Sequence, residues 1–241
     1  MRLLFVNPRA GSGDALGEVK RAATQRRIEL RELEELDATG ADVVGVAGGD
    51  GSLAEVAAVA LERDLPFVVV PLGTRNHFAR DLGIDPDDPV GALEAFDAPE
   101  RRIDVGRVNG RVFLNNVSLG AYAASVHGDG SLARWLLRFR RSPLRLGVHG
   151  EERKVLVLLV GNNEYDGRGG RERLDAGTLS AYALEHRPWL RLRRDAELGT
   201  RFVVDARAER VQAAIDGEPV ELEPPLVFEL EPRALRVRIT P

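Results

Sequence analysis

The chain has 241 residues, 44% of them hydrophobic, and a formal net charge of −4. This length and composition allow one large domain or two modest ones with a hydrophobic core, and they argue against general disorder. The absence of cysteine excludes disulfides, thiolate zinc sites and a cysteine nucleophile, and the 4 histidines show no metal-ligand spacing. Any metal is therefore expected to be a hard ion with oxygen ligands. The negative charge offers no general attraction to nucleic acid.

Targeting signals are not evident in the sequence. No apolar run is long enough to span a bilayer, and the first strand-like segment, Leu3–Val6, is too short for the apolar region of a signal peptide. We therefore expect a cytoplasmic protein.

The amino-terminal part alternates short apolar runs with helix-like segments, which is the pattern of a parallel α/β sheet. The predicted strands are Leu3–Val6, Val43–Ala47 and Phe67–Val70, and the predicted helices are Leu16–Ala23, Leu53–Leu61, Asn76–Leu82 and a short one near Val90–Phe96.

Beyond a boundary that we place near residue 100, runs of period two predict an antiparallel sandwich. The Asn109-Gly110 pair predicts a tight hairpin turn between the first two strands. The predicted strands are Ile103–Val108, Arg111–Val117, Val155–Val160, Leu179–Leu184, Phe202–Val204, Val211–Ile215, Val227–Leu230 and Leu235–Ile239. With no long linker at the boundary, the two units are expected to share a cleft.

Three of the amino-terminal strands run into loops rich in glycine and small polar residues, at positions 7–13, 48–52 and 71–76. Such loops converge at the carboxyl edge of a parallel sheet. In the second loop, Gly48-Gly49-Asp50-Gly51-Ser52, glycines allow close approach to phosphates and the following helix supplies N–H donors. A Rossmann site is weakened because no acid follows about twenty residues later, and a Walker loop is excluded because no glycine-lysine-serine/threonine sequence occurs. Asp50 implies a nearby magnesium ion, or alternatively caps the helix.

These loops and three later motifs resemble the diacylglycerol kinase catalytic domain family, which includes bacterial lipid kinases and sphingosine kinases. The matching segments are Val6–Gly13, Gly48–Leu53, Pro71–Gly83, Asn115–Gly120, Val160–Asn163 and Asp216–Glu218. The resemblance implies an amino-terminal α/β domain akin to NAD kinase and phosphofructokinase, followed by a carboxy-terminal β-sandwich, with ATP bound between them. Residues 1–100 would then bind the nucleotide and residues 101–241 the lipid substrate.

The resemblance also implies the site residues. The nucleotide would be lined by Asn7, Arg9, Gly11, Gly48, Gly49, Asp50, Gly51, Ser52, Gly73, Thr74 and Asn76. The catalytic residues would be Asp50, Asp216 and Glu218, with Glu218 as the general base that takes the proton from the lipid hydroxyl. Composition alone favours a hairpin turn for Asp216-Gly217-Glu218-Pro219. Arg9 and Arg75 are candidates for compensating phosphate charge.

The chain departs from the family pattern at several points. The family usually has threonine at Ser52, and Asp or Asn is common at His77. The metal-associated Asp-Asp-Gly turn is replaced by Asp175-Ala176-Gly177, which leaves Asp175 as the predicted metal ligand on that turn. Between Ala15 and Ala41 one helix of the family pattern is missing.

An amphipathic segment carries the predicted membrane contact. Its apolar residues are Leu132, Trp135, Leu136 and Phe139, at helical spacing, among the arginines Arg134, Arg138, Arg140, Arg141 and Arg145. The commoner use of such a stripe is packing against the sandwich.

The leading expectation is transfer of the ATP γ-phosphoryl group, with Mg²⁺, to a hydroxyl of diacylglycerol or a related lipid at a membrane surface. The alternatives are a kinase of a soluble acceptor such as NAD or a sugar phosphate, and a non-catalytic nucleotide- or lipid-binding homologue. We expect no nucleic acid partner and no transmembrane segment; a homodimer and peripheral association with the inner membrane face are compatible with the sequence.

Overall fold

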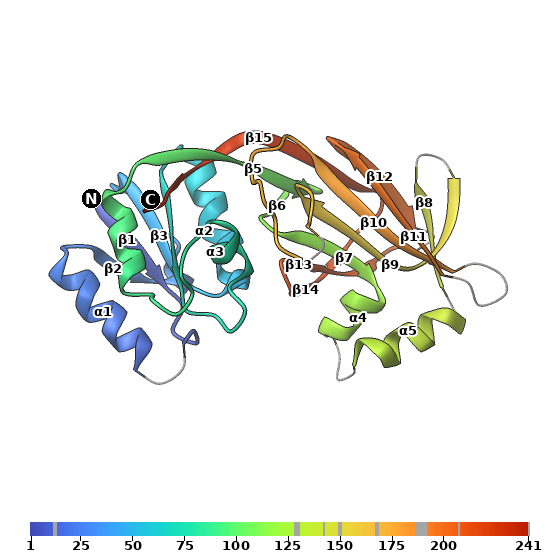
Figure 1. The fold of residues 1–241 in the computed structure, drawn as a ribbon, viewed down its shortest axis with the longest axis horizontal. Helices are drawn as coiled ribbons and strands as arrows, with labels where there is room; N and C mark the ends of the chain where they lie inside the picture. Colours follow the sequence, from blue (N-terminus) through green and yellow to red (C-terminus); the bar gives the residue numbers. More distant parts are fainter. Residues whose placement is uncertain are drawn as a thin grey trace. The chain divides into compact units, whose positions relative to one another are not determined.

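The computed structural model describes residues 1–11, 14–127, 131–141, 143–148, 151–166, 169–186, 192–206 and 208–240. The chain divides into two compact units (Figure 1). Unit 1 consists of Met1–Val105, Asp166–Asp175 and Pro232–Pro241, and unit 2 consists of Gly106–Tyr165 and Ala176–Glu231. Two later segments of the chain therefore belong to the amino-terminal unit.

Unit 1 is built on a parallel sheet in the order β4-β3-β1-β2. Its strands are β1 (Arg2–Val6), β2 (Glu29–Glu32), β3 (Val43–Gly48) and β4 (Phe67–Pro71). Every residue of β3 and β4 is buried, as expected for central parallel strands covered on both faces. The end of β15 (Leu226–Arg238) adds a parallel pairing to β4 at Val237 and Phe67.

Helices lie beside this sheet (Figure 1). They are α1 (Ala15–Gln25), α2 (Asp50–Glu62), α3 (His77–Asp81) and the 3-10 helices η1 (Leu33–Glu35) and η2 (Gly91–Asp97). In α2 the buried residues Leu53, Val56, Ala57 and Ala60 recur at helical spacing, which gives the helix one face toward the core. Residues 26–42, all of them described, contain β2 and η1 but no α-helix, so the missing helix is confirmed.

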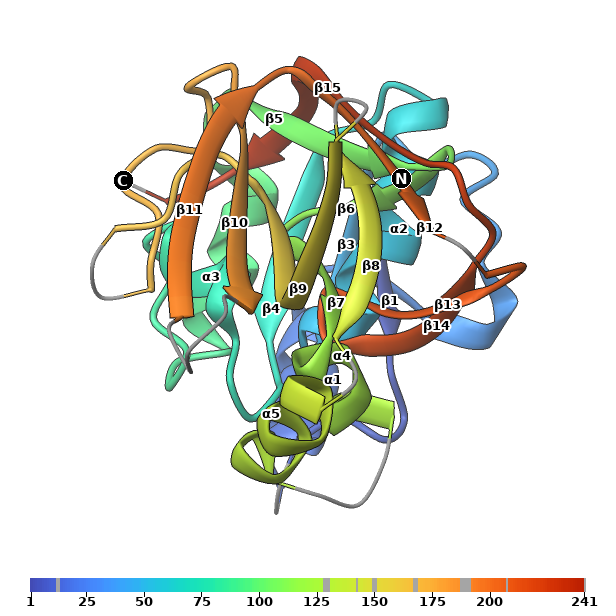
Figure 2. The same ribbon diagram turned by 90° about the vertical axis from the view of Figure 1, so that its right-hand side faces the viewer.

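Unit 2 is an antiparallel assembly of strands. Its members are β6 (Arg111–Phe113), β7 (Asn116–Gly120), β8 (Leu144–Val148), β9 (Glu151–Asn162), β10 (Leu179–His186), β11 (Leu192–Gly199), β12 (Arg201–Ala206), β13 (Val211–Ile215) and β14 (Glu218–Leu222), with parts of β5 (Glu100–Val108) and β15. Figure 2 shows β8, β9, β10 and β11 side by side, and the residue pairings agree. The core is formed by buried aliphatic residues with Phe113, Phe202 and Phe228. The expected fold class, an α/β unit with a strand-rich antiparallel unit, is confirmed.

Two helices follow β7 in unit 2, α4 (Ala121–His127) and α5 (Leu132–Arg141). The amphipathic pattern predicted α5, whereas α4 was not predicted.

Two strand predictions need correction. Arg111–Val117 is divided into β6 and the start of β7, and the two carboxy-terminal predictions are parts of the single strand β15. Within β15, Arg233 has a φ of 50°, and its backbone N–H donates to Asp104 Oδ1 (2.8 Å). This local irregularity interrupts the apolar alternation that the sequence prediction used.

Candidate functional site

The predicted nucleotide loops follow β1, β3 and β4, which are adjacent in the parallel sheet of unit 1. The carboxyl ends of these strands therefore lie at one edge, where α/β sheets bind their ligands. The structure describes the first loop as far as Gly11, and Ser12 and Gly13 lie outside the described residues.

Hydrogen bonds connect the three loops. Asn7 Nδ2 of the first loop donates to Ser52 Oγ of the second (2.7 Å). Gly11 N donates to the carbonyl oxygen of Leu72, at the start of the third loop (2.8 Å). Ser52 is buried although it is polar, and this contact satisfies its hydroxyl. Asn7, Gly11 and Ser52, predicted separately as nucleotide residues, thus belong to one connected group of loops.

Glycine is required where the second and third loops meet. A Cβ atom at Gly73 would lie 2.4 Å from Gly49 Cα, and a Cβ atom at Gly49 would lie 3.0 Å from Gly73 Cα. The neighbouring atoms are backbone and cannot move aside as a flexible side chain could. The absence of a side chain at these two positions lets the loops lie in contact. This is a structural reason for glycine here, in addition to phosphate binding.

Asp50 also connects the second loop to the third. Its carboxylate accepts hydrogen bonds from the backbone N–H groups of His77 (3.0 Å) and Phe78 (3.1 Å), the first two residues of α3. These N–H groups have no acceptor within their own helix. The helix-capping alternative for Asp50 is thus realised, although the helix that it caps is α3 and not the α2 in which it lies. The capping fixes the carboxylate at the loop edge.

The remaining residues of the third loop divide into two kinds. Asn76, buried and with a φ of 49°, accepts from Gly73 N (2.9 Å) and donates to Gly73 O (2.8 Å), so its side chain shapes the loop. Thr74 and Arg75 are exposed, as is Arg9 in the first loop. The exposed hydroxyl and the two guanidinium groups can meet a ligand, whereas Asn76 is occupied by the backbone.

An ion pair that the sequence analysis missed supports α3. Arg171 lies in the Asp166–Asp175 segment, and its Nη2 is 2.7 Å from Asp81 Oδ2, with side-chain exposures of 0% and 9%. Its backbone N also donates to Asp81 Oδ1 (3.1 Å), and its guanidinium lies 5.9 Å from the ring centroid of Phe78. No spacing rule could have indicated this contact, because the two residues are 90 positions apart.

Asp175, the predicted metal ligand, is close to two guanidinium groups. Its Oδ1 lies 3.1 Å from Arg173 Nη2 and its Oδ2 lies 3.7 Å from Arg233 Nη2. Among the described residues there is no group of three or more histidine or carboxylate side chains that could hold a metal ion. The charge of Asp175 is therefore balanced by arginine.

In unit 2, Asp216 and Gly217 form the two-residue turn between β13 and β14, with φ values of 50° and 89°. The buried carboxylate of Asp216 accepts from the backbone N–H groups of Leu114 (2.8 Å), Asn115 (2.7 Å) and Asn116 (3.0 Å). Asp216 thus fixes the turn to the segment before β7. Glu218, the next residue after the turn, pairs through its backbone with Ile215, and its side chain is exposed with no hydrogen-bond or ion-pair partner among the described residues.

Three asparagines of unit 2 make further side-chain hydrogen bonds; Asn162 and Asn163 are buried, and Asn116 is partly exposed. Asn162 Nδ2 donates to Leu114 O (3.2 Å), and Asn163 Oδ1 accepts from Ala176 N (3.0 Å). Asn116 Nδ2 donates to the hydroxyl oxygen of Tyr165 (2.9 Å). A largely buried polar network in which the groups satisfy one another favours a fixed geometry. The turn that carries Glu218 consequently has a rigid base.

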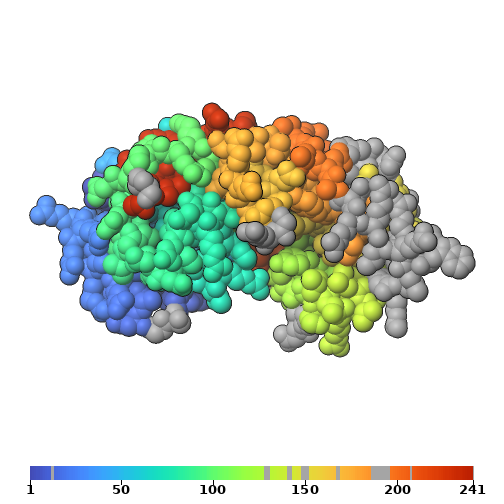
Figure 3. All heavy atoms as spheres, viewed as in Figure 1, coloured from blue at the N-terminus to red at the C-terminus, as the bar shows by residue number. Residues whose placement is uncertain are grey.

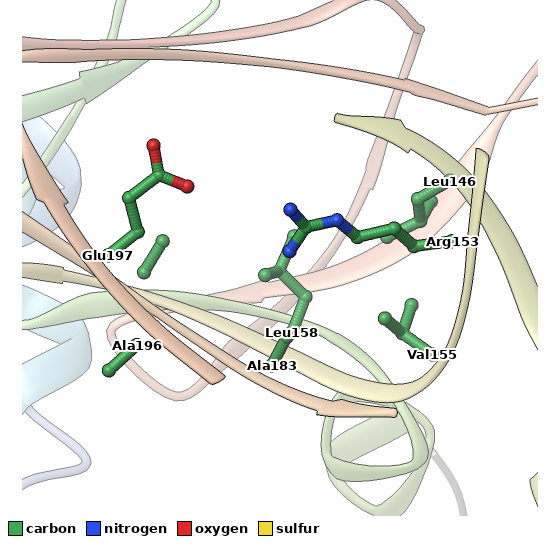
Figure 4. A pocket seen from close by; sticks show the side chains of 8 residues that line it. Leu146, Arg153, Val155, Leu158, Ala183, Ala196 and Glu197 are labelled. Carbon is green, nitrogen blue, oxygen red and sulfur yellow. The ribbon is translucent and has the colours of Figure 1, made fainter. Parts of the chain in front are cut away.

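Unit 2 also contains a cavity of about 140 Å³. Side chains of β8 to β11 line it (Figure 4): Leu146, Arg153, Val155, Leu158, Ala181, Ala183, Ala196 and Glu197. Sites for small molecules are typically about 300–1,000 Å³, so this mainly apolar cavity is too small for a nucleotide.

The chain is similar in sequence to a known protein family and to several known proteins. Residues 2–108 match the family model of the diacylglycerol kinase catalytic domain. A Pseudomonas aeruginosa protein named probable lipid kinase YegS-like is 33% identical over 258 residues, covering 87% of this chain and 80% of that protein. The diacylglycerol kinase of Bacillus subtilis is 37% identical over 107 residues, which is 43% of this chain and 31% of that protein.

The crystal structure of a diacylglycerol kinase from Bacillus anthracis superimposes with a TM-score of 0.73 at 19% identity, covering 99% of this chain and 96% of that one. The fold is thus shared over essentially the whole length, and the sequence match to the Pseudomonas protein extends over most of both chains. The motifs that resembled this family lie on the loops and the turn described above and on the strands β7 and β9. The chain belongs to the diacylglycerol kinase catalytic domain family of lipid kinases.

Proposed function

We propose that this lipid kinase transfers the γ-phosphoryl group of ATP to a hydroxyl group of diacylglycerol or a related lipid. The observation that carries the proposal is the connection of three glycine-rich loops at one edge of the sheet of unit 1. Their backbone is fixed by contacts among themselves, so it need not be ordered by the ligand. Preorganised N–H groups and cations are what phosphoryl transfer chiefly requires of a protein.

The nucleotide phosphates would lie at the amino end of α2. Backbone N–H groups there have no acceptor within the helix and attract anions. Arg9 and Arg75 are exposed beside the loops and carry no ion pair among the described residues. Their guanidinium groups would balance phosphate charge.

Magnesium would enter together with the nucleotide. Mg²⁺ in kinases is usually bound by one or two carboxylates together with substrate phosphates, without a dedicated protein cage. Asp50, at the loop edge, fits that mode. Asp175 is the predicted carboxylate of a second metal site, and a cation there would have to displace Arg173 and Arg233.

We assign the proton transfer to Glu218. Its exposed carboxylate has no other polar partner in the described part of unit 2, whereas the Asp216 carboxylate accepts three backbone N–H groups. A general base must be able to receive a proton from the attacking hydroxyl. Asp216 would act through the turn, by holding Glu218 in position.

Glu218→Gln tests this assignment. The amide cannot take the proton, so turnover should fall by about 100- to 10,000-fold, while the affinity for ATP should stay within about twofold of the unmodified protein. Nucleotide binding is measured by calorimetry and turnover by phosphorylated lipid. Near-normal turnover of a folded Glu218→Gln protein would move the base elsewhere.

The acceptor is tested with the unmodified protein. Diacylglycerol and other lipids that carry a hydroxyl group are compared with NAD and sugar phosphates in the same assay. Phosphorylation of a soluble acceptor alone would contradict the lipid proposal, and ATP binding with no transfer to any acceptor would support a non-catalytic homologue. We propose that the reaction takes place at the cytoplasmic face of a membrane.

A further inference from the structure

No helix in the described part of the chain is both long enough and apolar enough to span a bilayer. A lipid acceptor nevertheless requires contact with a bilayer, and the following inference rests on the proposed function for this reason. We propose that the outward face of α5 in unit 2 docks on an anionic membrane surface, with Leu137 entering the bilayer and Arg134 and Arg138 at its headgroups.

The exposure of α5 separates its two faces. Ala133, Arg134, Leu137 and Arg138 follow one another at helical spacing, and all are exposed. Of the stripe predicted from sequence, Trp135, Leu136 and Phe139 are only partly exposed, whereas Leu132, at the start of the helix, is exposed. Because α5 packs against α4 and β9, we infer that Trp135, Leu136 and Phe139 face unit 2 and that the face left to a partner is the opposite one.

Exposed leucines are few. The large hydrophobic side chains that are exposed in the described chain are Met1, Leu132, Leu137 and Leu198. Leu137 has the largest exposure, 63%, and shares α5 with Leu132. In Figure 3 the yellow-green side chains of α4 and α5 lie at the surface of unit 2. A leucine so exposed gains free energy when an apolar phase covers it.

The charged residues of α5 are all arginines. Arg134 and Arg138 have no carboxylate partner among the described residues, and α5 contains no Asp or Glu. Arg138 lies over the ring of Trp135, 5.1 Å from its centroid, which holds this guanidinium against the helix. In a chain whose net charge is −4, this is a local excess of positive charge.

Both features together favour an anionic bilayer over other partners. Basic residues on either side of an apolar side chain are typical of helices that lie in the membrane interface. A nucleic acid or another polyanion would use the arginines, but it would gain nothing from Leu137. A second copy of this chain, which is acidic overall, would have to cover Leu137 by self-association in solution, without vesicles. These alternatives give different outcomes in the test below.

The absence of cysteine allows a direct test. Leu137→Cys and, as a matched control, Leu198→Cys each receive one environment-sensitive fluorophore; Leu198, 52% exposed, lies on β11. The labelled proteins are titrated, without ATP, with phosphatidylcholine vesicles and with vesicles that also contain phosphatidylserine. Neither lipid offers a hydroxyl acceptor, so binding is measured independently of catalysis.

We expect the probe at position 137 to shift to the blue with the anionic vesicles alone, and the probe at position 198 to remain unchanged. In unlabelled protein, Leu137→Ser should weaken vesicle binding by about ten- to a hundredfold, and Leu198→Ser should leave it unchanged. Arg134→Gln combined with Arg138→Gln should weaken it by about tenfold or more. Added salt should also reduce the binding.

Three results would overturn the inference. They are equal responses at positions 137 and 198, loss of binding with the arginine changes but not with Leu137→Ser, and a shift at position 137 that depends on protein concentration without vesicles. The second result indicates a general anion site and the third indicates self-association. Vesicle binding by a protein that phosphorylates no lipid would leave this inference intact and refute the proposed function instead.

Discussion

Removal of the Asp216 carboxylate should lower the unfolding free energy of unit 2 far more than loss of an ordinary surface charge. The carboxylate is buried and accepts three backbone N–H groups, of which those of Leu114 and Asn115 belong to buried residues. Hydrogen bonds to charged groups contribute about 1.5–3 kcal/mol each, and an unsatisfied buried donor costs about 1–3 kcal/mol. Since Asn116 is partly exposed and water can replace one bond there, we expect Asp216→Ala to lower the unfolding free energy by about 3–5 kcal/mol.

Asp216→Asn separates the hydrogen bonds from the backbone conformation. Asparagine also tolerates the positive φ of this turn, and an amide oxygen in the place of Oδ1 keeps the bonds to Asn115 and Asn116 while losing the one to Leu114. We expect a loss of about 1–3 kcal/mol. Glu218→Gln, on the exposed side of the same turn, should leave the unfolding free energy unchanged.

Urea unfolding followed by tryptophan fluorescence suits this measurement, because both tryptophans, Trp135 and Trp189, fall in the residue range of unit 2. The slope against urea must stay constant for the comparison to hold. A loss below about 1 kcal/mol for Asp216→Ala would refute the reasoning, since it would mean that the three N–H groups find other acceptors easily.

Three further changes test unit 1. Asp50→Ala should abolish phosphotransfer in a folded protein and lower its stability by only about 0.5–2 kcal/mol, the usual cost of a lost helix cap; full activity would contradict its role. Gly73→Ala, whose methyl group would lie 2.4 Å from a backbone Cα atom of the second loop, should weaken ATP binding; unchanged affinity would contradict the close fit of the loops. Burial raises the pKa of Glu100, but hydrogen bonds from Arg236 and Arg238 outweigh it and hold that pKa below its ordinary range. The stabilisation from ionised Glu100 is therefore present above its ordinary pKa and lost as pH falls through the lowered pKa. Glu100→Gln should accordingly lower the unfolding free energy at neutral pH and leave it unchanged in strong acid. Urea unfolding at the two pH values measures this difference.

Three strands of unit 1, β1, β3 and β4, could be predicted because they are apolar runs, whereas the polar strand β2 was not predicted. Val43–Gly48 and Phe67–Pro71 are buried on both faces, so every residue carries the same signal. The hairpin at Asn109-Gly110 could be predicted for a different reason, since both residues adopt the positive φ that such a turn needs.

Strands at the edge of unit 2 left no comparable signal. β11 is rich in charged residues and is held by backbone pairing with β10, which its side chains do not reveal. The helix α4 is rich in alanine and packs closely against β13, and it lacks the large apolar residues that mark an amphipathic helix. Both elements depend on tertiary contacts.

The sequence indicated the motifs of the candidate site but not the contacts that their residues make. The spacing of Gly48–Ser52 indicated a phosphate loop, yet nothing in it showed that Asp50 would cap α3. The Asp216-Gly217 pair was read both as a turn and as part of a site, and the turn is present. The buried pair of Arg171 and Asp81 joins distant segments, and only the folded chain reveals it.

The central claim is lipid phosphorylation, and the most direct measurement is the transfer of label from γ-labelled ATP to lipid. The purified protein is incubated with labelled ATP, Mg²⁺ and mixed micelles that contain diacylglycerol or other lipids with a hydroxyl group, and lipid is extracted and counted. We predict a labelled phospholipid whose rate of formation falls by about 100-fold or more in Glu218→Gln and is abolished in Asp50→Ala. Absence of label from every lipid, with label appearing in a soluble acceptor or in none, would contradict the account.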